Sequence, residues 1–146
     1  MKSAIIDLDG TLSDNSHRKH LIEGENKEWR KYLEKASEDE LIEDVADFIR
    51  DLAEDHRMVV LTMRSDEIRC QTLDWLESHD IPFDELIMLS EGRWEISDDN
   101  FKKEKIDEIE NPVLAIDDKI SNCKMFESQG LKTYTVEDGE PVRFHS

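Results

Sequence analysis

Five short apolar runs, separated by segments of helical periodicity, constrain the fold of this chain more than any other feature. The runs cover residues 3–8, 57–62, 85–89, 112–117 and 131–136. Between the second and fifth runs, three segments have helical spacing of apolar residues: 65–79, 99–110 and 119–129. Because strands that alternate with helices build parallel sheets covered on both faces, the sequence predicts a three-layer α/β fold with five parallel strands.

The connection between the first two apolar runs is longer than the others. We expect residues 13–26 to form a polar loop or flap, followed by helices over 27–36 and 40–54. The second of these helices has apolar residues along one face, which should pack against the sheet. The segment 13–56 is therefore predicted to be a small insertion, too short for a large separate cap domain.

Length and cysteine content limit the class of protein. A chain of 146 residues suits one domain, here residues 1–146, in which 137–146 are expected to be a polar tail. No apolar segment is long enough to cross a membrane, and no signal peptide is evident. Cys70 and Cys123 lie far apart without metal-ligand spacing, so we expect a reduced, cytoplasmic protein.

The charge of the chain is strongly negative. Its formal net charge is -18 at pH 7. Such a surface repels nucleic acid at low salt. The sequence also has no basic stripe that could follow a polynucleotide backbone. Composition taken alone therefore argues against a polynucleotide partner.

Two carboxylates leave the first apolar run together. Within this run, Ala4-Ile5-Ile6 is followed directly by the sequence Asp7-Leu8-Asp9-Gly10-Thr11-Leu12. Since side chains alternate along a strand, Asp7 and Asp9 leave its end on the same side. Two close carboxylates repel each other unless a cation or a shared proton lies between them. This arrangement suits a Mg²⁺ site with a nucleophile beside an acid/base group.

Other polar side chains follow later apolar runs. Thr62 ends the second run, and Asp117 and Asp118 end the fourth. The carboxyl ends of parallel strands meet at one edge, where open α/β sheets bind ligands, so these side chains should lie near the first two carboxylates. A cation could come from one helix, where three lysines compete for this role: Lys102, Lys103 and Lys105.

The first motif, Asp-x-Asp-Gly-Thr-Leu, resembles that of the haloacid dehalogenase (HAD) superfamily of aspartate-nucleophile phosphatases. The resemblance implies a Rossmann-like HAD fold with a minimal cap. It implies that Asp7 is the nucleophile and Asp9 the acid/base group, and that Thr62 donates to the phosphoryl oxygens. It also implies a Mg²⁺ site made by Asp7, Asp9 and Asp117, with Asp118 supporting the metal or its waters.

A closer resemblance, over nearly the whole chain, is to the 3′-phosphatase domain of phage-type polynucleotide kinase/phosphatase. The segments that carry it are Ser16-His17-Arg18-Lys19-His20, Trp29 and Tyr32, Thr62-Met63-Arg64-Ser65-Asp66, Asp98-Asp99-Asn100-Phe101-Lys102 and Ala115-Ile116-Asp117-Asp118-Lys119. The resemblance selects Lys102 among the three lysines, and it implies that Arg18, Thr11 and Arg64 contact the substrate. A guanidinium suits this role because its fork matches phosphate oxygens.

Two features depart from that family. Met63 stands where the family usually has Gly, which alters the surroundings of Thr62. No Gly-x-x-x-x-Gly-Lys loop occurs, so we expect no ATP-dependent kinase activity.

The resemblance implies a Mg²⁺-dependent phosphomonoester hydrolase that forms an aspartyl-phosphate. Its substrate would be a phosphorylated 3′ end of DNA or RNA in end repair, and a separate kinase or ligase could be its partner. The acidic composition favours an alternative, a phosphatase for free nucleotides or small phosphomonoesters. A third possibility is an inactive binding subunit with a HAD fold, against which the intact motifs argue.

Overall fold

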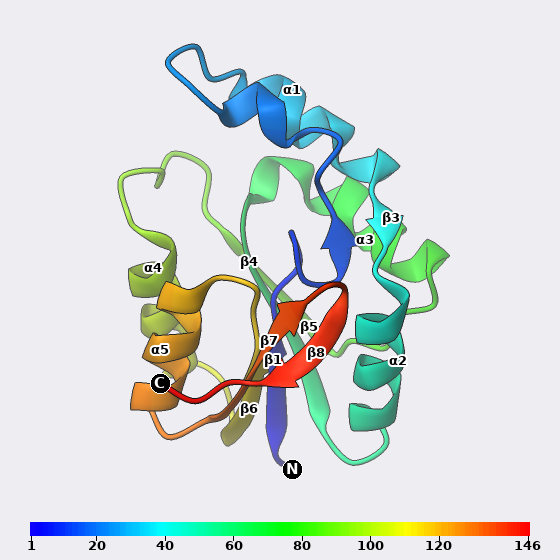
Figure 1. The fold of residues 1–146 in the computed structure, drawn as a ribbon, viewed down its shortest axis with the longest axis vertical. Coiled ribbons are helices and arrows are strands. Elements are labelled where there is room, and N and C mark those ends of the chain that lie inside the picture. The colour runs from blue at the N-terminus through cyan, green and yellow to red at the C-terminus, as the bar shows by residue number, and fades with distance from the viewer.

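The computed structural model describes residues 1–146 and is built around one six-stranded sheet (Figure 1). Its strands are β1 (Ser3–Ile6), β4 (Arg57–Ser65), β5 (Glu85–Leu89), β6 (Pro112–Ile116), β7 (Lys132–Glu137) and β8 (Glu140–Arg143). The spatial order is β5-β4-β1-β6-β7-β8, and the first five of these strands are parallel. All five predicted strands are present, and their carboxyl ends share one edge of the sheet.

Helices cover both faces of the sheet, which confirms the predicted three layers. The helices that pack on the sheet are α2 (Glu43–Leu52), α3 (Arg69–Ser78), α4 (Asp98–Ile106) and α5 (Ile120–Ser128), and a 3₁₀ turn, η3 (Asp66–Ile68), precedes α3. α2 and α3 lie on one face, α4 and α5 on the other (Figure 1). Alternate residues of β1 enter the two cores: Ile6 packs with Val60 on the α2/α3 side, and Ile5 packs with Phe101 on the α4/α5 side.

The end of the chain differs from the predicted polar tail. β8 pairs antiparallel with β7, from Tyr134 opposite Arg143 to Glu137 opposite Glu140, and adds a sixth strand. Asp138 and Gly139, with φ of 50° and 78°, form the turn between them. Left-handed residues at both central positions match the twist of a hairpin, and Asp-Gly is a preferred pair there. The expectation of a polar tail was therefore wrong, and the five predicted parallel strands are joined by a sixth, antiparallel one.

The segment 13–56 begins with irregular structure over the carboxyl edge of the sheet (Figure 1). It contains β2 (Ser13–Asp14), η1 (Lys19–Ile22), α1 (Trp29–Glu34), η2 (Lys35–Glu38) and β3 (Glu40–Leu41), with β2 and β3 paired antiparallel. The helix expected over 27–36 is a short α-helix followed by a 3₁₀ turn, and the helix expected over 40–54 begins later, after β3. No helix has the length and hydrophobicity needed to cross a lipid bilayer.

Candidate active site

Three carboxylates from two neighbouring strands meet at the carboxyl edge of the sheet. Asp7 follows β1, and Asp117 and Asp118 follow β6, which pairs parallel with β1. Oxygen atoms of the three side chains lie within 4.8 Å of one another. Asp7 and Asp117 are buried. The strand ends thus converge as the sequence analysis expected.

Lys102 is the cation that joins this cluster. Its Nζ lies 2.8 Å from Asp7 Oδ1 and 2.6 Å from Asp117 Oδ2, and the side chain is fully buried on the inner side of α4. Lys103 is exposed, and Lys105 instead pairs with Glu108. The structure therefore brings Lys102, and neither of the other two lysines, to the carboxylates.

The cluster has more carboxylates than cationic side chains, which suits the binding of a divalent cation. Burial and the charge of Asp7 raise the pKa of Asp117 to about 7 and that of Asp118 to about 8. Burial works against the charge of Lys102, but Asp117 and Asp7 raise its pKa well above the usual value. Asp98 Oδ1, 3.5 Å from Lys102 Nζ, is buried without a hydrogen-bond partner. These oxygen ligands and their surplus negative charge fit Mg²⁺.

Residues of the turn after β1 hold the side chain of Asp7, the candidate nucleophile, in place. Thr11 Oγ1 donates to Asp7 Oδ2 over 2.7 Å and accepts from the backbone N–H of Asp118 over 3.0 Å. Gly10 has φ of 82°, and a Cβ there would lie 2.3 Å from Asp118 Oδ2. Glycine is therefore required by the close approach as well as by the backbone. Thr11 is fully buried and holds carboxylates, so its side chain is not on the surface that a substrate would meet.

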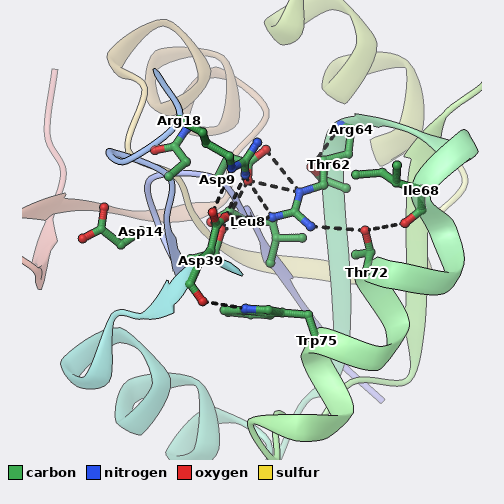
Figure 2. Close-up of polar contacts among 12 residues, drawn as sticks. Leu8, Asp9, Asp14, Arg18, Asp39, Thr62, Arg64, Ile68, Thr72 and Trp75 are labelled. Atoms are coloured by element: carbon green, nitrogen blue, oxygen red, sulfur yellow. Dashed lines mark hydrogen bonds and ion pairs between the residues drawn. The ribbon is translucent and has the colours of Figure 1, made fainter. Parts of the chain in front are cut away.

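The Asp9 carboxylate lies outside the cluster and binds two arginines (Figure 2). Arg18 Nη2 donates to Asp9 Oδ1 over 2.6 Å, and Arg64 Nη2 donates to the same oxygen over 2.7 Å. Both arginines are almost completely buried. Burial alone would raise the pKa of Asp9, but Arg64 and Arg18 outweigh it and lower that pKa. The pair thus holds Asp9 as a carboxylate.

Asp39, which the sequence analysis did not identify, completes this network (Figure 2). It accepts from Arg18 Nε over 2.8 Å and Nη2 over 2.7 Å, and from Arg64 Nη2 over 3.3 Å. His17 Nε2 lies 2.7 Å from Asp39 Oδ1, and Trp75 Nε1 donates to the Asp39 carbonyl over 2.9 Å. Asp9 alone cannot balance the charges of two buried arginines, so a second carboxylate is needed. This need is the only signal for a residue like Asp39 in the sequence.

The arginines expected to contact substrate are thus engaged within the protein. Arg18 is fully buried, and it does not line the pocket described next. Burial works to lower its pKa, but hydrogen bonding to Asp39 and the charge of Asp9 raise that pKa. Arg64 does line the pocket, while donating to Asp9, Asp39 and Thr72. Direct contact of either arginine with a substrate stays a prediction.

A pocket of about 1150 Å³ opens above these groups. Asp7, Asp9 and Thr62 line its floor at the strand ends, and Met63 borders it next to Thr62. Thr62 Oγ1 accepts from the backbone N–H of Arg64 over 3.1 Å, which leaves its hydroxyl proton free for a ligand. The site can therefore place an anionic ester next to the Asp7 carboxylate, the Thr62 hydroxyl and the acidic cluster.

Comparison with known proteins identifies a family. A family model described as the polynucleotide kinase PNKP phosphatase domain matches residues 1–140. No curated protein sequence matches the chain.

Solved structures show the same fold. Two chains from structures of a Pnkp1/Rnl/Hen1 complex, one described as an RNA repair complex, are each 25% identical to this chain, with TM-scores of 0.78 and 0.75. They cover 92% and 98% of this chain, which spans only 42% and 47% of theirs. The HAD-hydrolase YfnB from Bacillus subtilis, in a form bound to magnesium, is 14% identical to this chain, with a TM-score of 0.60. The matched region covers 90% of this chain and 86% of the YfnB chain.

Proposed function

We propose that this chain, a HAD-type phosphatase that belongs to the family of polynucleotide kinase PNKP phosphatase domains, hydrolyses 3′-phosphate ends of nucleic acid. The observation that carries the proposal is the position of Asp7. Its carboxylate lies at the floor of the pocket, next to Lys102 and to the two carboxylates after β6. In the proposal, residues 1–146 form one catalytic domain with the insertion 13–56 above its site.

In the first step, Asp7 attacks the phosphorus atom in line with the ester oxygen, which departs as the bond to phosphorus breaks. The phosphoryl group is then held on Asp7 as an aspartyl-phosphate. Thr62, through its free hydroxyl proton, and Lys102 stabilise the charge that spreads over the phosphoryl oxygens.

Asp7, Asp117 and Asp118 would hold Mg²⁺. A bound Mg²⁺ offsets the repulsion between the Asp7 carboxylate and the anionic ester. Asp9 was also expected as a ligand, but its carboxylate is turned towards Arg18 and Arg64, and we assign it to proton transfer.

As the anionic ester binds beside Asp9, its negative charge offsets the two arginines, so that Asp9 takes up a proton and gives it to the leaving 3′-oxygen in the first step. It then takes a proton from the water molecule that attacks the aspartyl-phosphate, which releases inorganic phosphate and restores Asp7. Arg18 and Arg64 act as positioning residues that hold Asp9 beside the pocket.

The assignment of a polynucleotide substrate is supported by the family and by the two similar chains of the Pnkp1/Rnl/Hen1 structures. A separate kinase or ligase is the partner we propose, and a cytoplasmic location is part of the same proposal. The net charge of -18 favours a second candidate, a phosphatase for free nucleotides or small phosphomonoesters. An inactive binding subunit is disfavoured because the nucleophile, the lysine and the acidic cluster are all in place.

Release of inorganic phosphate in the presence of Mg²⁺ tests the proposal. The substrates are a 3′-phosphorylated oligonucleotide, a 3′-mononucleotide and an aryl phosphate, with Asp7→Asn as the control. A strong preference for the oligonucleotide would support end processing. Equal or better turnover of the small esters would move the assignment to the second candidate. Near-normal turnover by Asp7→Asn would remove Asp7 as the nucleophile.

A further inference from the structure

Two exposed tryptophans border the catalytic pocket. Trp29 is 53% exposed and Trp94 is 79% exposed, whereas the third tryptophan, Trp75, is buried. Trp29 and Trp94 both line the pocket that has Asp7 at its floor. Indole rings this exposed to water are uncommon in proteins and are enriched where a ligand or partner covers them.

Each tryptophan comes from a different segment above the sheet edge. Trp29 begins α1 and meets Tyr32 edge-on, with ring centroids 5.9 Å apart and an interplanar angle of 89°. Tyr32 is buried, with Asn15 on its hydroxyl and the Arg18 guanidinium over its ring, so Trp29 rests on a fixed support. Trp94 belongs to the connection 90–97 between β5 and α4. Neither indole N–H has a hydrogen-bond partner in the protein.

The charge of the pocket does not explain how a polyanion would bind there. Its cationic and anionic lining residues are Lys19, Arg30, Arg64 and Lys119 against Asp7, Asp9, Glu67, Asp98 and Asp118. The side chains that line the pocket therefore have no excess of positive charge, on a chain whose net charge is -18. Attraction to a phosphate backbone, the usual source of affinity for nucleic acid, is therefore weak here.

We infer that Trp29 and Trp94 are stacking platforms for nucleobases next to the 3′-phosphate of a single strand. This inference rests on the proposed function and deepens it. Aromatic rings bind successive bases without regard to sequence, because every base has a π-face. Stacking needs no net positive charge, so it reconciles a polynucleotide substrate with an acidic protein.

The first test compares two substrates that both release an alkyl alcohol. One is a 3′-phosphorylated single-stranded hexanucleotide, and the other, glycerol 2-phosphate, has no base. The measured quantity is the ratio of kcat/KM for the hexanucleotide to kcat/KM for glycerol 2-phosphate. We expect Trp29→Ala and Trp94→Ala each to lower this ratio by about fivefold to a hundredfold. In the matched variants Trp29→Phe and Trp94→Phe, this ratio should stay close to that of the wild type. A change in the ratio below twofold in both Ala variants would overturn the inference.

The second test measures binding without turnover, so that the two proposals can fail separately. In Asp7→Asn, an unphosphorylated hexanucleotide should quench tryptophan fluorescence. Adding Trp29→Ala or Trp94→Ala should weaken its binding by the factor seen in kinetics. If the wild type prefers glycerol 2-phosphate but quenching depends on both tryptophans, the proposed function fails and the stacking inference stands. If the hexanucleotide is preferred but neither tryptophan affects binding, the stacking inference fails alone.

The dependence on salt gives an independent readout. For the wild type, kcat/KM for the hexanucleotide should change by less than about threefold between 50 and 200 mM salt, or rise as repulsion is screened. A single strand held in a basic groove through three to five phosphate contacts would lose about twentyfold to a hundredfold in affinity over this range. A loss of that size would indicate a basic groove and overturn the inference.

Discussion

Replacing Asp39 with asparagine would test the network that positions Asp9. The Asp39 carboxylate is buried and has two guanidinium groups and His17 within hydrogen-bond distance. Asparagine has nearly the same shape but carries no charge, so the two buried guanidiniums would be left with Asp9 as their only carboxylate. The perturbation therefore changes the charge of the network with little change in packing.

The expected loss of stability follows from burial. Removing one partner of a buried ion pair costs about 3–5 kcal/mol, because the remaining charge stays buried without compensation. Arg18 is fully buried and Arg64 nearly so, and Asp9 is partly exposed. We expect Asp39→Asn to lower the free energy of unfolding by about 3 kcal/mol, near the lower end of that range, because the charge of Asp9 still balances one guanidinium.

Urea unfolding at neutral pH measures this quantity, with Asp47→Asn as the control. Asp47 also pairs with an arginine, Arg50, at 3.2 Å, but its side chain is 71% exposed, and the change should stay within about 0.5 kcal/mol. A loss below about 1 kcal/mol for Asp39→Asn would refute the argument that the network is held by buried charge.

The same variant should affect catalysis according to the leaving group. An alkyl alcohol needs a proton from Asp9 as it departs, whereas an aryl alcohol leaves readily without one. If Asp39 positions Asp9, kcat/KM in Asp39→Asn should fall at least about tenfold more for an alkyl phosphate than for an aryl phosphate. An equal fall for both esters would indicate that Asp39 has only a structural role.

Three further predictions concern the acidic cluster. Gly10→Ala places a Cβ 2.3 Å from Asp118 Oδ2 at φ of 82°, so it should lower stability by about 1 kcal/mol or more and slow phosphate release at least about tenfold. Lys102→Met leaves two buried carboxylates unpaired, and urea unfolding without metal should show a loss of about 3–5 kcal/mol. In EDTA, the melting temperature should fall as pH rises from about 4 towards 8. The reason is that Asp117, with a pKa of about 7, and Asp118, with a pKa of about 8, keep protons in the folded protein that the unfolded chain has released. Mg²⁺ should therefore raise the melting temperature more at pH 8.5 than at pH 5.5.

The sequence predicted those parts of the site that depend on regular structure. Asp7, Thr62 and Asp117 each lie at or near the carboxyl end of a predicted strand, and the geometry of a parallel sheet is enough to bring such residues to one edge. Lys102 was chosen by resemblance, and helix α4 places it, rather than the two lysines near it, against the carboxylates.

The parts that were missed depend on irregular structure. Asp39 contacts Arg18 within the insertion and Arg64 on β4, and no helical or strand periodicity relates the three positions. The ion pairs of the two arginines with Asp9 and Asp39 were missed because a guanidinium pairs equally well with a phosphate and with a carboxylate, and a sequence does not distinguish these partners. β8 was missed although Asp138-Gly139 is a hairpin signal, because the strand after it is short and polar.

The ion pairs around Asp39 also bear on the kinetics of the enzyme. Arg18 and Asp39 belong to the insertion, whereas Asp9 and Arg64 belong to the edge of the sheet, so movement of the insertion away from the sheet would separate buried opposite charges. Two of these ion pairs, Arg18 with Asp9 and Arg64 with Asp39, therefore hold the insertion against the sheet edge before any substrate binds. Substrate therefore enters a pocket that is already assembled, without waiting for a lid to close.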